Sequence, residues 1–180
     1  MSDKLKKHAV FLDRDGVINN AVIRDGKPYP PAGLAEIRIN PGVLNALKKL
    51  HDLGFLLIVA TNQPDVSRGR ITRESVDEIH TYLLKTLPLD HIQVCYHDNH
   101  DQCDCRKPQP GLLLKAAEQF NIDLSSSFMV GDRWSDVEAG KRAGCKTIFI
   151  DNGYTEKKPD NPDFKISSIA EAVEIILSQG

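Results

Sequence analysis

The stretch HAVFLDRDG, residues 8–16, joins a short apolar run directly to polar side chains, and this pattern returns along the sequence. The run at 8–12 is predicted to form a buried strand, because its apolar residues are continuous rather than alternating. Helical patterns separate this run from the later ones, and such β-α-β alternation predicts an α/β fold, a parallel central sheet covered by helices on both faces. The later runs are at 55–60, 91–96, 128–131 and 146–150.

The segments between the runs carry the start and stop signals of helices. In the first, at 40–54, Asn40 is the expected N-cap, Pro41 the first helical residue and Gly54 the residue after the end. The Pro- and Gly-rich pieces at 24–34 and 151–163 are typical of surface loops and too short to link domains. We therefore expect one domain over residues 1–180. Further helices are expected at 72–87, 110–120, 135–143 and 167–178.

The charge balance argues against two classes of partner. The formal net charge is −2 and the pI about 6.3, so there is no basic field to hold nucleic acid or an anionic membrane. The apolar run near the N-terminus stops at Asp13, too early for a secretory signal, and no later stretch approaches the roughly 20 apolar residues of a membrane span. We expect a cytoplasmic protein, a monomer by default, that binds a small soluble ligand.

Polar side chains follow the apolar runs at the points where the predicted strands end. Ligands of an open parallel sheet bind beyond the carboxyl ends of its strands, so these side chains are the candidates for a site. An Asp-x-Asp-Gly turn is by itself as compatible with a solvated loop as with chemistry, and the convergence of several such places changes that balance. The candidates are Asp13, Asp15, Thr61, Asn62, Arg106, Lys107, Asp132, Arg133 and Asp136.

Carboxylates gathered at one sheet edge need a cation to offset their charge. A hard divalent ion with carboxylate ligands, beside a lysine and a hydroxyl that bind phosphate, is typical of a Mg²⁺-dependent phosphoryl-transfer site. A carboxylate that approaches a phosphate dianion to about 4 Å meets a repulsion of roughly 8 kcal/mol at an effective dielectric of 20. The metal and Lys107 are therefore both needed if a carboxylate of this cluster is to attack phosphorus.

Four segments in this order resemble the motifs of the haloacid dehalogenase-type (HAD) phosphatases: FLDRDGVIN (11–19), TNQ (61–63), CRKPQPG (105–111) and GDRWSD (131–136). The resemblance covers about residues 8–150 and implies the Rossmann-like HAD fold. It also implies that Asp13 is the nucleophile, forming an aspartyl-phosphate, and that Asp15 protonates the leaving oxygen and then activates water.

The same resemblance implies the ligands of the metal and of the transferred phosphoryl group. Mg²⁺ would be held by the carboxylates of Asp13 and Asp132 and by the backbone carbonyl of Asp15. Thr61 and Lys107 would bind the phosphoryl oxygens, with Asn62 shaping the same loop. Asp136 is expected to lie behind the metal ligands rather than to bind the ion.

A second cluster holds three of the four cysteines, in VCYHDNHDQCDCRKP, residues 94–108. Cys95, His97, Cys103 and Cys105 provide the sulfur and imidazole ligands of a tetrahedral zinc site, with His100 as an alternative ligand. A disulfide in this cluster is disfavoured by the reducing compartment and by the small ring it would close, whereas a structural zinc contributes roughly 10–16 kcal/mol in small peptides. Four protein ligands leave no open position, so we expect a structural zinc.

This cysteine pattern directly before Arg-Lys-Pro resembles the HAD branch of the D-glycero-D-manno-heptose 1,7-bisphosphate phosphatases and the histidinol-phosphate phosphatases. The resemblance implies a capless Mg²⁺-dependent phosphatase of carbohydrate metabolism that removes the 7-phosphate of the heptose bisphosphate, with Arg106 recognising the substrate. Two positions depart from that branch: Pro64 follows Gln63 where a serine is common, and Arg133 replaces a lysine and offers a forked donor to the substrate.

Three alternatives remain at this stage. The first keeps the chemistry and changes the substrate to histidinol phosphate or another small phosphorylated metabolite. A polynucleotide 3′-phosphatase is disfavoured by the acidic charge balance. A zinc-stabilised binding module without catalysis is disfavoured because Asp13, Asp15, Lys107 and Asp132 are all present.

Overall fold

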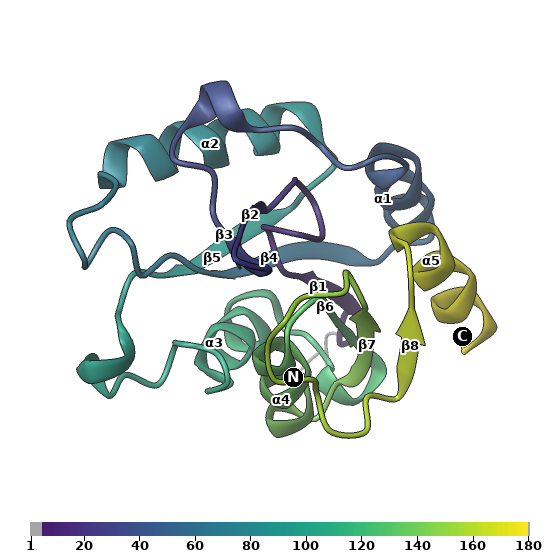
Figure 1. Ribbon diagram of the computed structural model, residues 1–180. Helices are drawn as coiled ribbons and strands as arrows, with labels where there is room; N and C mark the ends of the chain where they lie inside the picture. Colours follow the sequence, from purple (N-terminus) through teal and green to yellow (C-terminus); the bar gives the residue numbers. More distant parts are fainter. Residues whose placement is uncertain (1–4, 180) are drawn as a thin grey trace.

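The computed structural model describes residues 5–179, and its centre is a six-stranded sheet in the order β5-β4-β1-β6-β7-β8 (Figure 1). Every neighbouring pair in this sheet is parallel, as the continuous apolar runs predict. The predicted α/β class is therefore confirmed. The strands are β1 (Ala9–Leu12), β4 (Leu56–Asn62), β5 (His91–Cys95), β6 (Phe128–Gly131), β7 (Lys146–Ile150) and β8 (Phe164–Ile166).

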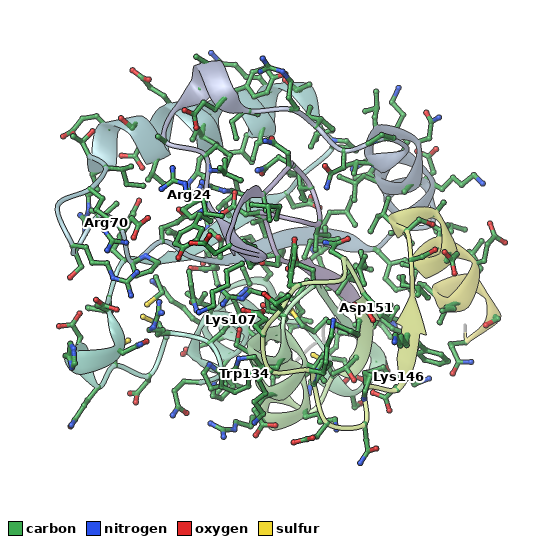
Figure 2. All side chains as sticks on the ribbon, viewed as in Figure 1. Arg24, Arg70, Lys107, Trp134, Lys146 and Asp151 are labelled. Atoms are coloured by element: carbon green, nitrogen blue, oxygen red, sulfur yellow. The ribbon has the colours of Figure 1, made fainter. Side chains whose placement is uncertain are left out.

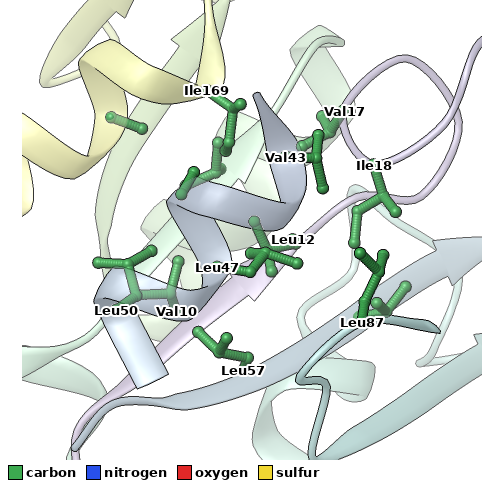
Figure 3. Packing of buried hydrophobic residues seen from close by; sticks show 14 of the residues in the cluster. Val10, Leu12, Val17, Ile18, Val43, Leu47, Leu50, Leu57, Leu87 and Ile169 are labelled. Carbon is green, nitrogen blue, oxygen red and sulfur yellow. The ribbon is translucent and has the colours of Figure 1, made fainter. Parts of the chain in front are cut away.

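Helices cover the sheet on both faces. Val10 and Leu12 of β1 belong to one apolar cluster, which includes side chains of α1, α2 and α5 and is seen in close-up in Figure 3. Ala9 and Phe11 belong to a second cluster with α3 and α4, because successive residues of a strand point to opposite faces. The helices are α1 (Val43–Asp52), α2 (Arg73–Thr86), α3 (Gly111–Phe120), α4 (Trp134–Ala143) and α5 (Ile169–Ser178).

The order of the strands places a crevice at the end of β1. From β1 the chain moves outward to β4 and β5, and it then returns to β6 on the other side of β1. The connection after β1 therefore runs to one side of it, and the connection into β6 runs to the other side. Where connections diverge in this way, a crevice is left at the carboxyl ends of the strands, and ligands bind there. Residues 13–16 follow β1, and residues 61–63 and 131–133 lie at the carboxyl ends of β4 and β6.

The start of α1 differs from the expected one. Asn40 is not the N-cap: the helix begins at Val43, and Gly42 precedes it in the left-handed region at a φ of 80°. The backbone N–H of Asn40 donates to the carbonyl of Ile18 (2.9 Å), and its side-chain amide donates to the carbonyl of Val17 (3.1 Å). Asn40 therefore holds the chain that follows β1, and a left-handed glycine starts the helix in its place.

Short strands lie in or beside the two predicted surface loops. Strands β2 (Val22–Arg24) and β3 (Lys27–Tyr29) form an antiparallel hairpin. Its turn is Asp25-Gly26, with φ angles of 49° and 72°, the positive values that a two-residue hairpin turn requires. Strand β8 follows the second loop and extends the sheet beside β7. No helix in residues 5–179 is long and apolar enough to cross a membrane.

The contact between α4 and the sheet depends on a glycine. A Cβ on Gly140 would lie 2.7 Å from the Cβ of Met129 and 2.8 Å from the Cγ2 of Thr147. Alanine in a helix interior gains about 0.5–1 kcal/mol over glycine, whereas overpacking a core costs roughly 1–3 kcal/mol. We predict that Gly140→Ala lowers the free energy of unfolding by about 1 kcal/mol, measured by denaturant titration. Gly33→Ala is the control, since nothing lies within 4 Å of its added Cβ; equal stability of the two variants would contradict the packing argument.

Candidate active site

Lys107 lies at the centre of a buried charge cluster in the crevice (Figure 2). Its ammonium donates to Oδ1 of Asp13 (2.8 Å), to Oδ1 of Asp136 (2.6 Å) and to the carbonyl of Ala60 (2.6 Å). Asp13 follows β1, Asp136 lies in the first turn of α4, and Ala60 is in β4. One side chain thus joins three elements that are far apart in the sequence.

The cluster has more negative than positive charge. Burial raises the pKa of Asp13 to about 6, against the lowering effect of Lys107 and with the help of Asp136. Burial, followed by the charges of Asp13 and Asp136, raises the pKa of Asp132 well above its usual range. Burial alone would lower the pKa of Lys107, yet the two carboxylates raise it, so this side chain stays protonated. One ammonium therefore faces three carboxylates.

The carboxylates fit a divalent cation. Oxygen atoms of Asp13, Asp132 and Asp136 lie within 4.8 Å of one another. Oδ1 of Asp132 is buried and has no hydrogen-bond partner among residues 5–179, which is a costly state for a carboxylate oxygen. A Cβ on Gly16 would lie 1.8 Å from Oδ2 of the same residue, so only glycine permits this close approach. An all-oxygen donor set with an unused buried oxygen suits Mg²⁺.

Asp15 is held by N–H donors on both oxygens. Nε and Nη2 of Arg14 donate to Oδ1 and Oδ2, each at 3.1 Å. The side-chain amides of Asn19 and Gln63 donate to Oδ1 (2.9 Å) and Oδ2 (2.8 Å). Nη1 of Arg14 lies 3.1 Å from Nε2 of His80, on α2. The carboxylate is thus fixed in its plane at the wall of the cavity described below.

Asn62 and Thr61 end β4 with different roles in the structure. Asn62 makes a reciprocal pair with the backbone of Lys107: its Nδ2 donates to the carbonyl (3.0 Å) and its Oδ1 accepts from the N–H (3.1 Å). Thr61 is buried, and its hydroxyl accepts from the side-chain amide of Gln63 (3.0 Å). Asn62 lines the cavity, whereas Thr61 is not among the described residues that do. Asn62 therefore fixes the backbone that presents the ammonium.

A cavity of about 430 Å³ opens above the charge cluster. Asp13, Asp15 and Lys107 form part of its wall, and residues 27–30 of the β2–β3 hairpin line it from another side. Three arginines, Arg68, Arg106 and Arg133, also line it. Arg106 donates from Nε to Oδ1 of Asn99 (2.9 Å) and from Nη1 to the carbonyl of His97 (3.2 Å). The cavity thus combines acidic groups at one end with cationic groups at the rim.

Arg133, also at the rim, is already paired with a carboxylate. Nε and Nη2 of Arg133 donate to the two carboxylate oxygens of Glu156, at 2.9 and 2.7 Å. This fork-to-fork arrangement is the strongest form of an arginine–carboxylate pair. Arg133 lines the cavity, but its forked donors point to Glu156 in the loop after β7. The sequence analysis did not identify Glu156 as the partner of Arg133.

The sulfur and imidazole groups gather at the end of β5. Cys95, His97, Cys103 and Cys105 form a four-residue group that could hold a metal, and all the cysteines are free. Sγ of Cys95 lies 3.7 Å from Sγ of Cys103, and Nδ1 of His97 lies 3.3 Å from Sγ of Cys105. Tetrahedral zinc with Zn–S bonds near 2.3 Å needs S–S edges of about 3.8 Å. The 2.7 Å between Cys95 and Cys105 is shorter, so binding an ion requires these two to separate.

Two side chains that hold Asp132 were missed by the sequence analysis. The hydroxyl of Tyr154 donates to Oδ2 of Asp132 (2.6 Å), and Nδ2 of Asn152 lies 3.2 Å from the same atom. Both residues follow β7, whose carboxyl end is a further place where polar groups meet the crevice. The signal was present, because Asp151-Asn152 directly follows the apolar run at 146–150.

Sequence comparison places the chain among known hydrolases. A family model described as HAD-hydrolase-like matches residues 104–173. The relatives include proteins named D-glycero-β-D-manno-heptose-1,7-bisphosphate 7-phosphatase. The one from Pasteurella multocida is 34% identical and covers 94% of this chain and 97% of its own. Those from Escherichia coli K12 (32%; 95% and 94%) and Helicobacter pylori (38%; 79% and 82%) carry the same name.

Solved structures show the same arrangement. The D,D-heptose 1,7-bisphosphate phosphatase of B. bronchiseptica, complexed with magnesium and phosphate, matches with a TM-score of 0.76 and 27% identity, covering 96% of this chain and 99% of that one. A HAD-like phosphatase of Mesorhizobium loti (mll2559) matches with a TM-score of 0.78 and 27% identity over 97% of this chain and 88% of its own. The described architecture is therefore that of HAD phosphatases.

The contact between Arg14 and His80 makes a prediction about acid stability. Burial, and then the charge of Arg14, lowers the pKa of His80 from 6.5 to about 3. Between pH 6.5 and pH 3, His80 therefore binds a proton in the unfolded chain but not in the folded chain. The stability present above pH 6.5 is lost as the pH falls toward 3. Between pH 7 and pH 5 the loss from this residue is about 2 kcal/mol.

The measurement is the free energy of unfolding at the two pH values for the wild type and for His80→Gln, which cannot titrate. The wild type should lose about 2 kcal/mol more than the variant over this interval. Equal losses would mean that His80 is protonated in the folded protein, in conflict with its contact to Arg14.

Proposed function

Because this chain belongs to the HAD-like D-glycero-β-D-manno-heptose-1,7-bisphosphate 7-phosphatase family, we propose that it hydrolyses the 7-phosphate of that heptose bisphosphate. It is a phosphatase of the HAD type, a hydrolase of phosphomonoesters. The observation that carries the proposal is the buried contact of Lys107 with Asp13 at the floor of a cavity that Arg106 also lines.

The proposed reaction runs in two steps on this chain's own carboxylates. An oxygen of Asp13 attacks phosphorus, and a bond forms between them while the bond from phosphorus to the sugar oxygen breaks. Asp15 gives its proton to that departing oxygen and so becomes a carboxylate. It then takes a proton from a water molecule, which attacks the aspartyl-phosphate, releases inorganic phosphate and restores Asp13.

Lys107 and Asp136 prepare this attack. The ammonium touches the nucleophile and is placed to neutralise the oxygens of an entering phosphoryl group. Asp136 accepts from the ammonium on Oδ1 and from the backbone N–H of Arg133 on Oδ2 (3.0 Å), so both oxygens are engaged. Asp136 thus serves to aim Lys107, which supports the expectation that it lies behind the metal ligands.

Mg²⁺ is the proposed cofactor of the acidic cluster. The carboxylates of Asp13 and Asp132 and the backbone carbonyl of Asp15 would hold it, and the unpartnered Oδ1 of Asp132 supports this assignment. When bound, the ion offsets the negative charge that phosphate brings to the nucleophile. Tyr154 and Asn152 occupy the other oxygen of Asp132 and fix the direction in which Oδ1 points.

The rim of the cavity supports a substrate with a second anionic group. Arg106 is held by Asn99 and by the carbonyl of His97, so its guanidinium is placed before any ligand enters. A planar, permanently charged fork suits a second phosphate. We assign Arg106 to the distal phosphate. Arg133 would lie at the rim near the reacting phosphate and contact it through Nη1, which takes no part in the pair with Glu156. Histidinol phosphate lacks a second phosphate and makes less use of Arg106.

Zinc is the proposed ion of the thiol cluster, with a structural role. Cys95, His97, Cys103 and Cys105 would fill its four positions and leave none for water. The last of these ligands directly precedes Arg106 and Lys107 in the sequence. The ion would therefore fix the loop that carries both cations.

A phosphate-release assay tests the function. The substrates are the β and α anomers of the heptose 1,7-bisphosphate, histidinol phosphate and common hexose phosphates, each with Mg²⁺. We expect the highest kcat/KM for the β anomer and release from C7. A preference for histidinol phosphate would replace the proposed substrate, and no release from any of these compounds would overturn the proposed function.

Asp13→Asn tests the covalent step. The amide keeps the shape of the side chain but is not a nucleophile, so Mg²⁺-dependent phosphate release should fall by at least 10³-fold. The thermal unfolding midpoint and the zinc content should stay close to those of the wild type. Activity retained to within tenfold, in a preparation free of wild-type protein, would rule out Asp13 as the nucleophile.

The thiol cluster predicts a metal content. Protein purified without added metal should carry about one zinc per chain, measured by elemental analysis, and Cys103→Ser should reduce this content and the unfolding midpoint together. The matched control is Cys145→Ser, because Cys145 is a buried free cysteine that is not one of the four residues of the thiol cluster and should leave the zinc content unchanged. Less than half an equivalent of zinc in the wild type would count against a structural ion.

A further inference from the structure

Arg14 is a fully buried arginine whose side chain contacts the proposed acid, Asp15. Its fork donates to both oxygens of that carboxylate. A buried guanidinium is costly unless its donors are engaged, and Nη1 is engaged by His80. The charge of Arg14 is therefore offset on one side by Asp15, and its orientation is completed on the other side by a histidine.

The contact fixes the state of the histidine. Arginine has donors and no acceptor, so Nε2 of His80 must accept from Nη1, and the proton of the neutral ring must be on Nδ1. The low pKa of His80, caused by burial and then by the charge of Arg14, keeps the ring neutral at working pH. His80 is therefore an acceptor of fixed tautomer.

The helix that carries His80 gives it a firm position. Ile79 and Leu83, beside it on α2, belong to the apolar cluster on that face of the sheet. Asn19 and Gln63, which also touch Asp15, each place one N–H elsewhere, on the carbonyl of Asn20 and on the hydroxyl of Thr61. Each amide thus grips one oxygen of Asp15, whereas Arg14 grips both and sets the plane of the carboxyl group.

We propose that His80 is a positioning residue for this phosphatase: through Arg14 it holds the carboxyl group of Asp15 in the plane from which a proton passes to the leaving oxygen. This rests on the proposed function, in which Asp15 is the general acid. His80 touches neither substrate nor the reacting atoms, and its effect on proton delivery is seen in the transfer step, before Asp15 takes a proton from water in the hydrolysis step.

The leaving group distinguishes positioning from a general structural role. An alkoxide leaving group, as from a sugar phosphate, needs a proton as the P–O bond breaks, and general acid catalysis of such a step contributes about 10²–10⁴-fold. A nitrophenolate leaves as a stable anion and needs little help. If the carboxyl group of Asp15 loses its fixed orientation, phosphoryl transfer from a sugar phosphate should therefore slow. Phosphoryl transfer from p-nitrophenyl phosphate should change little.

The experiment compares His80→Gln with His80→Asn. The Oε1 of glutamine is placed near the position of Nε2 and keeps an acceptor for Arg14, whereas asparagine is one methylene shorter and does not reach. Rate constants for release of the leaving group (the dephosphorylated sugar or nitrophenolate) in the first turnover with Mg²⁺ are measured for the heptose bisphosphate and for p-nitrophenyl phosphate, so that hydrolysis of the aspartyl-phosphate does not contribute. We expect His80→Asn to lose about 10–100-fold on the heptose bisphosphate and less than about threefold on the aryl ester, and His80→Gln to stay within about threefold of the wild type on both.

A second variant covers the case in which His80→Asn does not fold. Arg14→Lys keeps a buried charge but cannot grip both oxygens of Asp15, so it should show the same selective loss. Equal losses on the two substrates, or no loss in His80→Asn, would overturn the positioning role while leaving the proposed function standing. A wild type that is inactive on both substrates would overturn the proposed function itself.

Discussion

The contact between the Lys107 ammonium and the carboxylates of Asp13 and Asp136 is the interaction on which the site depends. Desolvating these charges is expensive, and removing the single ammonium would leave the buried carboxylates without a compensating charge, at a cost of roughly 3–5 kcal/mol. The cluster can exist only because several elements deliver opposite charges to one point. The cluster has three carboxylates and one ammonium, and this excess of negative charge favours the binding of a cation.

The segment that carries the thiol cluster, residues 95–105, is joined to the acidic cluster of Asp13, Asp132 and Asp136 through strands β4 and β5. Asn62, which clamps the backbone of Lys107, pairs with Cys95 across the β4–β5 ladder. Asp98, in the thiol loop, accepts a forked ion pair from Arg68, in the loop after β4. Asn62 thus contacts both ends of the segment 95–107, and Arg68 contacts it at Asp98.

The sequence predicted most of the strands and the acidic groups that follow them, because a buried strand and its polar end are local in the chain. It did not predict contacts between elements distant in sequence. His80 looked like an ordinary helix residue, and only the packing of α2 over β1 brings it to Arg14. Tyr154 was assigned to a surface loop, and only the fold brings its hydroxyl to Asp132.

The misplaced helix start has a physical reason of the same kind. Asn40 carries every local mark of an N-cap, but its amide hydrogen bonds to the segment after β1 compete with that role. The expected surface loop at 24–34 contains the Asp-Gly turn and the second strand of a hairpin that the pattern did not predict. Its strands are three residues each, and segments so short carry too little periodicity to be distinguished from irregular chain.

The central place of β1 also sets the order in which the molecule can assemble. Phe11 pairs with Ile58 on one side and with Met129 on the other, so the first strand to leave the ribosome is completed by one of the later ones. Pairings so distant carry a high loop-closure entropy, which slows folding. During synthesis the apolar residues of β1 lack their second neighbour until residues 128–131 emerge. Until then β1 presents an unpaired edge, at which the nascent chain can pair with another copy.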